Sequence, residues 1–122
     1  MREIKFRAKR IDNSKWIYGC LSYSKGDGLG AEYIEYAEIE SDIEIQDVWP
    51  ATIGQYTGLI DGNGVEIYEG DEFRTVWKSK KNTVQEGVVF WNVARGRWDA
   101  KNATFPSRSR KTTTITGNIH DK

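Results

Sequence analysis

The fold of this chain is indicated most clearly by residues 53–73, which read IGQYTGLIDGNGVEIYEGDEF. Short β-branched and aromatic runs alternate here with turn residues, as is typical of β-hairpins. Asp61-Gly62-Asn63-Gly64 is a strong turn signal, because Gly and Asn accept the positive φ that tight hairpins need. A second turn is predicted at Glu69-Gly70-Asp71. We therefore expect structural turn roles for Gly58, Asp61, Gly62, Asn63, Gly64 and Gly70.

Short β-branched and aromatic segments separated by turn residues continue on both sides of residues 53–73. Residues 4–8 and 16–23 predict two strands of a hairpin. Residues 33–45 are predicted as strand, although Glu and Ala also suit a helix. From Asp71 onward, about four strands with short connections predict a small, highly bent barrel. The chain is thus expected to be mainly β with little helix. An N-terminal β-hairpin region over residues 1–49 and a C-terminal barrel over residues 50–122 would form one compact unit.

Composition excludes several classes of protein. Aromatic residues make up 12 % of the 122 residues, too many for a disordered chain. No run of about 18 apolar residues exists, so no membrane span is expected. Residues 1–7 lack the apolar segment of a secretory signal. The single cysteine, Cys20, excludes an internal disulfide, and a reducing, cytoplasmic setting is therefore expected.

Charge is segregated along the chain, although the net charge is zero. Residues 26–73 contain thirteen acidic residues and no Lys or Arg, and the segments before and after carry +5 and +8. Acidic and basic strands can interleave and neutralise each other across a sheet. Alternatively, two faces of opposite sign would favour head-to-tail self-association or a charged partner. The sequence leaves both alternatives open.

Few residues point to catalysis or metal binding. His120 is the only histidine, which excludes a His-containing triad or a His-rich metal site within one chain. Asp61, Asn63 and Glu72 have the spacing of calcium ligands, but Glu66 stands where such a loop requires Gly. Gly-rich segments can also cradle phosphate, but residues 26–73 supply no Lys and no helix pattern follows. No catalytic, metal-binding or cofactor-binding residues are predicted.

The C-terminal third combines basic and aromatic residues in a way that suits nucleic acid. Basic side chains bind phosphates, and exposed aromatic rings stack on single-stranded bases. The alternative is that Trp77, Trp91 and Trp98 belong to the core. The zero net charge also argues against a dedicated nucleic-acid-binding protein. The residues of this candidate interface are Arg74, Trp77, Lys78, Lys80, Lys81, Arg95 and Arg97.

Three blocks of the sequence resemble one protein family. Residues 53–73 resemble the central signature of the YopX family, small proteins carried by phages and prophages. Residues 2–8 resemble the opening strand of the family, and residues 115–120 resemble its closing strand. The blocks occur in the family's order and span nearly the whole chain. The resemblance implies a β-rich fold with an SH3-like small barrel, a tendency to self-associate, and no catalytic residues.

These observations lead to two hypotheses of function. The first is a non-enzymatic accessory protein of a phage or prophage that acts in the host cytoplasm. It would be a self-associating binding or scaffolding module with an unknown host or phage protein as partner. The second is a weak nucleic-acid-binding protein that uses the basic C-terminal barrel.

Overall fold

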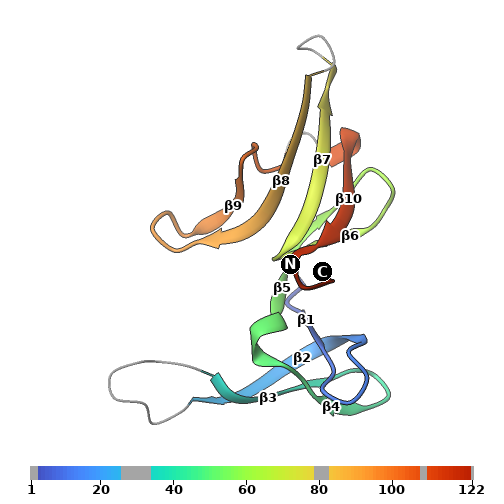
Figure 1. Ribbon diagram of the computed structural model, residues 1–122, viewed down its shortest axis with the longest axis vertical. Coiled ribbons are helices and arrows are strands. Elements are labelled where there is room, and N and C mark those ends of the chain that lie inside the picture. The colour runs from blue at the N-terminus through green and yellow to red at the C-terminus, as the bar shows by residue number, and fades with distance from the viewer. Residues whose placement is uncertain (1–2, 26–33, 79–82, 108–109, 122) are drawn as a thin grey trace. The chain divides into compact units, whose positions relative to one another are not determined.

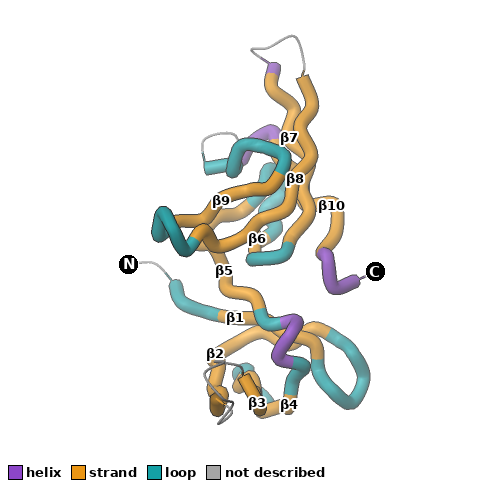
Figure 2. Tube along the Cα trace, turned by 60° about the vertical axis from the view of Figure 1, so that its left-hand side comes forward, coloured by secondary structure: helices purple, strands orange, loops and turns teal. Residues whose placement is uncertain are grey.

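The computed structural model describes residues 3–25, 34–78, 83–107 and 110–121 (Figures 1 and 2). The chain divides into two compact units, Met1–Gln55 (unit 1) and Tyr56–Lys122 (unit 2). Antiparallel strands dominate both units, and the helices are 3₁₀ turns of three residues each. The prediction of a mainly β fold with little helix is confirmed. That the two halves form one compact unit stays a prediction.

Unit 1 is an antiparallel sheet with the strand order β4-β3-β2-β1-β5. The strand bounds are β1 Phe6–Lys9, β2 Trp16–Lys25, β3 Ile34–Glu40 and β4 Ile45–Asp47, followed by the 3₁₀ turn η1 Pro50–Thr52 and the start of β5 Gly54–Ile60. The predicted N-terminal hairpin is confirmed as β1 and β2, paired from Phe6↔Gly19 to Lys9↔Trp16. β3 and β4 account for most of the stretch whose pattern had also suited a helix.

The core of unit 1 follows from the alternation of its strands. The pairs Ala8↔Ile17 and Leu21↔Ile39 place apolar side chains on one face of the sheet. The end of β4 returns to the end of β1, where the amide of Ile11 donates to the carbonyl of Asp47. Burial of small and branched side chains at these positions supplies the hydrophobic stabilisation of the unit. The buried cluster comprises Ala8, Ile17, Ala37, Ile39 and Val48.

Unit 2 contains a four-stranded antiparallel sheet with the order β10-β7-β8-β9, in which β7 and β8 form the long central pair (Figure 1). The elements are β6 Glu66–Tyr68, β7 Asp71–Trp77, β8 Thr83–Asn92, β9 Arg97–Lys101, η3 Arg110–Thr112, β10 Thr113–Asn118 and η4 Ile119–Asp121. The later part of β5 pairs with β6. The four strands predicted after Asp71 are confirmed. The SH3-like barrel is not confirmed, because the pairings among the described residues leave β9 and β10 as open edges of the sheet.

The core of unit 2 lies against the inner face of this sheet. Ile67, Phe73 and Val89 are fully buried, and Trp98 packs against them. Trp98 also contacts Trp91 edge-on, with 5.0 Å between ring centroids, an arrangement that aromatic pairs prefer. Trp98 is therefore partly buried against the core, as the alternative to base stacking required, whereas Trp91 is 40 % exposed.

Candidate functional site

The predicted turn at residues 61–64 is held by the side chain of Asp61, which is only 4 % exposed. Its Oδ1 accepts hydrogen bonds from the amides of Asn63 at 2.8 Å and Val65 at 2.9 Å. Its Oδ2 accepts from the amide of Ile115 on β10 at 3.0 Å. Gly64 has the positive φ, 81°, that the hairpin needs. Asp61 therefore fixes the turn and ties it to β10, which is a structural task.

The other predicted turn residues lie around the same hairpin. The amide of Gly62 donates to the carbonyl of Thr113 at 2.9 Å. Gly58 and Gly70 also have positive φ, and the amide of Gly70 donates to the carbonyl of Val89. Gly62 and Gly70 therefore join the ends of the β5–β6 hairpin to the four-stranded sheet. Gly58, Asp61 and Gly62 also line a second cavity, of about 500 Å³, together with Lys111.

The basic and aromatic residues predicted to bind nucleic acid are not gathered on one face. Arg74 is exposed and lies opposite Glu86 in the pairing of β7 with β8. Trp77, three residues along β7, points to the other face, where its indole donates to Oε1 of Gln85 at 3.0 Å. Lys78 is exposed at the end of β7. Lys80 and Lys81 lie outside the described residues.

Arg95 and Arg97 are exposed at the turn between β8 and β9. Asp99 lies nearby, and its pKa is lowered chiefly by the hydrogen bond from the amide of Ala100 and then by that from Asn92, with smaller contributions from the two arginines. The charge on this part of the sheet is therefore mixed in sign. An unbroken basic strip, which nucleic-acid binding would favour, is not formed by the predicted residues that the structure describes.

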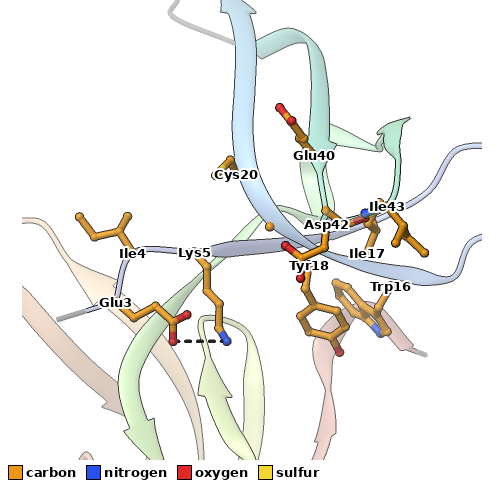
Figure 3. Close-up of a pocket in the computed structure, with 12 residues that line it drawn as sticks. Glu3, Ile4, Lys5, Trp16, Ile17, Tyr18, Cys20, Glu40, Asp42 and Ile43 are labelled. Carbon is orange, nitrogen blue, oxygen red and sulfur yellow. Dashed lines mark hydrogen bonds and ion pairs between the residues drawn. The ribbon is translucent and has the colours of Figure 1, made fainter.

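A groove of about 830 Å³ lies in unit 1 (Figure 3). Its floor is the first half of β2, from Trp16 to Cys20. One side is formed by residues 3–5, which precede β1, and the other by residues 40–43, which join β3 to β4. This groove was not predicted from the sequence.

The groove exists because β2 changes partners halfway along its length. β1 pairs with β2 only up to Gly19, and β3 pairs with β2 from Cys20 onward. The residues that precede β1 and those that follow β3 are not paired with β2 here, and they line the groove with it. Gly19 is required here, because a Cβ at this position would collide with the backbone carbonyl of Glu40.

The lining of the groove is apolar with an acidic rim. Ile4 is 67 % exposed and Ile43 is 90 % exposed, and they lie on opposite sides of the groove (Figure 3). The side chains of Trp16 and Tyr18 lie next to each other along β2. Glu3 forms an ion pair with Lys5 at 3.5 Å, whereas Glu40 and Asp42 add two negative charges to the other side. Contiguous exposed apolar surface often marks an interaction site, so this groove is the candidate binding surface of unit 1.

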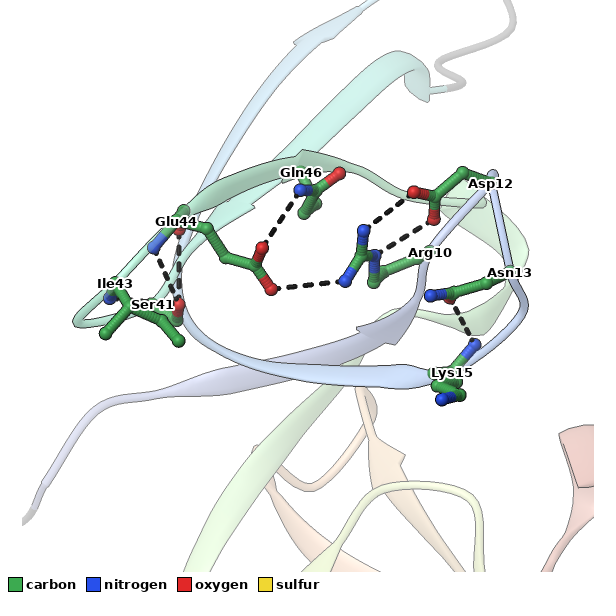
Figure 4. A network of polar contacts seen from close by, with 8 residues as sticks. All are labelled: Arg10, Asp12, Asn13, Lys15, Ser41, Ile43, Glu44 and Gln46. Carbon is green, nitrogen blue, oxygen red and sulfur yellow. Dashed lines mark hydrogen bonds and ion pairs between the residues drawn. The ribbon is translucent and has the colours of Figure 1, made fainter.

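A polar network anchors the loop that carries Ile43 (Figure 4). Arg10 donates to both carboxylate oxygens of Asp12, at 2.9 and 2.7 Å, and to Oε1 of Glu44 at 3.2 Å. Hydrogen bonding from Arg10 is the largest cause that holds the pKa of Asp12 below its ordinary value. Ser41 Oγ in turn accepts from the amide of Glu44 at 3.2 Å. These contacts tie the loop that carries Ile43 to Arg10, the residue that follows β1.

An acidic strip lies next to the groove, on the outer face of β3 and β4. Glu38 lies opposite Asp47 and Glu40 opposite Ile45. The hydroxyl oxygen of Tyr36 lies 2.5 Å from Asp47 and 3.1 Å from Glu38, so its single proton is shared between the two carboxylates. This hydrogen bonding, to Asp47 first and then to Glu38, raises the pKa of Tyr36. Among the residues of unit 1 that the structure describes, acidic side chains are therefore concentrated on β3, β4 and the loop that carries Ile43.

Neither a metal site nor a membrane-spanning helix is found in the described parts of the chain. There, no three or more His, Cys, Asp or Glu side chains are grouped closely enough to hold a metal ion. The helices described are too short and too polar to cross a bilayer. Cys20, at the floor of the groove, is a free and exposed thiol.

Comparison with known proteins adds a family and a fold. Residues 5–122 match the family model described as YopX protein. The structure resembles that of protein EF1440 from Enterococcus faecalis, with a TM-score of 0.59 and 21 % sequence identity over 99 % of this chain and 96 % of that chain. No curated protein matches the sequence significantly. At this identity the structural likeness shows a shared fold.

Proposed function

Because this chain belongs to the YopX family, we propose that it is a non-enzymatic, self-associating binding or scaffolding module whose binding surface is the groove of unit 1. The observation that carries the proposal is the pair of isoleucines, Ile4 and Ile43, that face solvent across this groove. Leaving such side chains exposed has a hydrophobic cost that a partner would remove. The proposal places the protein in the host cytoplasm as a phage or prophage accessory factor.

The distribution of charge between the units supports self-association. Unit 1 contains ten acidic residues and seven Lys or Arg, whereas unit 2 contains eight acidic residues and eleven Lys or Arg. The units therefore carry net charges of −3 and +3. Unit 1 of one copy would attract unit 2 of another, which mainly accelerates association and fixes register, while apolar contacts supply most of the affinity.

Light scattering coupled to size-exclusion chromatography tests this proposal at low and high salt. We expect an oligomer at micromolar concentration. Its association should weaken in about 1 M salt, because the Debye length there falls to about 3 Å and charges are screened. A single-chain mass at low salt would contradict self-association. An oligomer whose mass does not change with salt would contradict the electrostatic contribution but not self-association itself.

Weak binding of single-stranded nucleic acid is the second candidate function. Trp91 is 40 % exposed and belongs to the same hairpin as Arg95 and Arg97, so a stacking platform beside basic residues is favoured there. Fluorescence titration with short single-stranded DNA is expected to give weak or no binding at physiological salt. Tight binding that weakens steeply with salt would replace the first proposal by the second.

A further inference from the structure

The turn between β8 and β9 presents an apolar residue followed by basic ones. Val93 is 84 % exposed, Arg95 follows it in the turn, and Arg97 is the first residue of β9. The turn is fixed by Asn92, whose Oδ1 accepts from the amide of Arg95 at 3.1 Å and whose Nδ2 donates to Asp99 at 3.1 Å. A fixed turn loses little conformational freedom on binding. It is therefore suited to insert into a groove.

The groove of unit 1 has the complementary chemistry. Its apolar sides, Ile4 and Ile43, suit an aliphatic side chain, and its rim carries Glu40 and Asp42, which suit arginines. Arginine pairs well with carboxylates, because its planar group can donate two parallel hydrogen bonds. The same acidic rim repels the phosphates of nucleic acid or of a lipid surface. Charge thus favours a basic protein segment as the occupant.

We propose that the turn Val93–Arg97 of one copy docks into the groove of unit 1 of a second copy. Val93 enters between Ile4 and Ile43, and the two arginines pair with the carboxylates of the rim. This inference rests on the proposed self-association and names the two surfaces that carry it. The occupant is a second copy, because the chain itself supplies a segment with both the apolar and the basic features that the groove requires.

A contact of this kind joins two different surfaces, so each copy offers one turn and one groove. Such head-to-tail contacts close into a ring or continue as an open chain. They also have a property that a symmetric contact lacks. A copy with a defective turn and a copy with a defective groove still form one intact contact with each other.

Two single substitutions test the contact. Ile43→Lys removes an apolar wall of the groove and brings a positive charge towards the arginines. Val93→Asp removes the apolar residue of the turn and brings a negative charge towards the rim. Both side chains are almost fully exposed, so the fold of each unit is expected to survive. The matched controls are Ile11→Lys and Val84→Asp, which make the same changes at exposed apolar residues outside the two surfaces.

Sedimentation velocity is measured for each variant alone and for the two mixed in equal amounts. We expect each variant alone to associate at least about tenfold more weakly than the unaltered chain, as is usual for central contact residues. Mixing should restore association as a 1:1 heterodimer, while the controls assemble normally. If both variants assemble like the unaltered chain, or if mixing restores nothing, the docking proposal is overturned while self-association stands. If the unaltered chain has a single-chain mass at every concentration, both proposals fail.

Discussion

Replacing Asp61 by Ala tests how the signature turn is held. The carboxylate accepts three amide hydrogen bonds, at 2.8, 2.9 and 3.0 Å, while being only 4 % exposed. A hydrogen bond to a charged group contributes about 1.5–3 kcal/mol. Asn63 and Val65 are exposed, so water can replace part of what their amides lose. The hydrogen bond from the amide of Ile115 is less accessible to water, so its loss should cost the full contribution of that bond. We therefore expect Asp61→Ala to lower the free energy of unfolding of unit 2 by about 3–4 kcal/mol.

The matched variant is Asp61→Asn, which keeps one carbonyl oxygen for Asn63 and Val65. Its amide nitrogen would face the amide of Ile115, donor against donor, so a loss of about 2 kcal/mol is expected. Urea unfolding followed by tryptophan fluorescence measures both variants, with Trp77, Trp91 and Trp98 reporting on unit 2 and Trp16 and Trp49 on unit 1. A loss below about 1 kcal/mol for Asp61→Ala would refute the reasoning, because it would mean that the three bonds are not formed together.

Three further predictions concern single positions. Gly64→Val should lower the stability of unit 2 by about 1 kcal/mol or more in the same urea assay, because a β-branched residue is strained at a φ of 81°. Gly19→Ala should cost unit 1 at least about 2 kcal/mol, since the new methyl group meets the carbonyl of Glu40; near-normal thermal unfolding would count against this close approach. The carboxyl of Asp12 should titrate below 3.8 in NMR spectra and return towards 3.8 in Arg10→Gln. Because the folded pKa is the lower one, the contact stabilises at neutral pH and is lost as the pH falls through that value. An unchanged titration in Arg10→Gln would exclude Arg10 as the cause.

Local sequence patterns predicted much of the fold. The turn at residues 61–64 was predictable because Gly and Asn accept the positive φ of a tight turn, which most other residues avoid. The strands after Asp71 were predictable because β-branched and aromatic residues recur in them, as Phe73 and Thr75 do on the buried face of β7. Whether the sheet closes depends on pairing between strands distant in sequence. The barrel expectation therefore could not be derived from such patterns and is not confirmed.

The groove was not predicted, because it depends on where β2 changes partner. That point is set by the register of β1 and β3 along β2, which a single strand's sequence does not encode. Two signals could have indicated it. Gly19 interrupts an otherwise regular strand, and a glycine inside a strand often marks a close approach of backbones. Ile43 stands between acidic residues in a predicted strand, where its 90 % exposure was not foreseen.

The candidate nucleic-acid residues were grouped because basic and aromatic residues are frequent in the C-terminal third of the sequence. Composition does not show which face of a strand a residue occupies, and β-strand alternation places Arg74 and Trp77 on opposite faces.

Self-association is measured by sedimentation equilibrium of the unaltered chain over a wide concentration range at low salt. We expect an average mass above that of one chain at micromolar concentration, which rises further with concentration and falls when salt is added. A mass equal to that of a single chain across the whole range would contradict it.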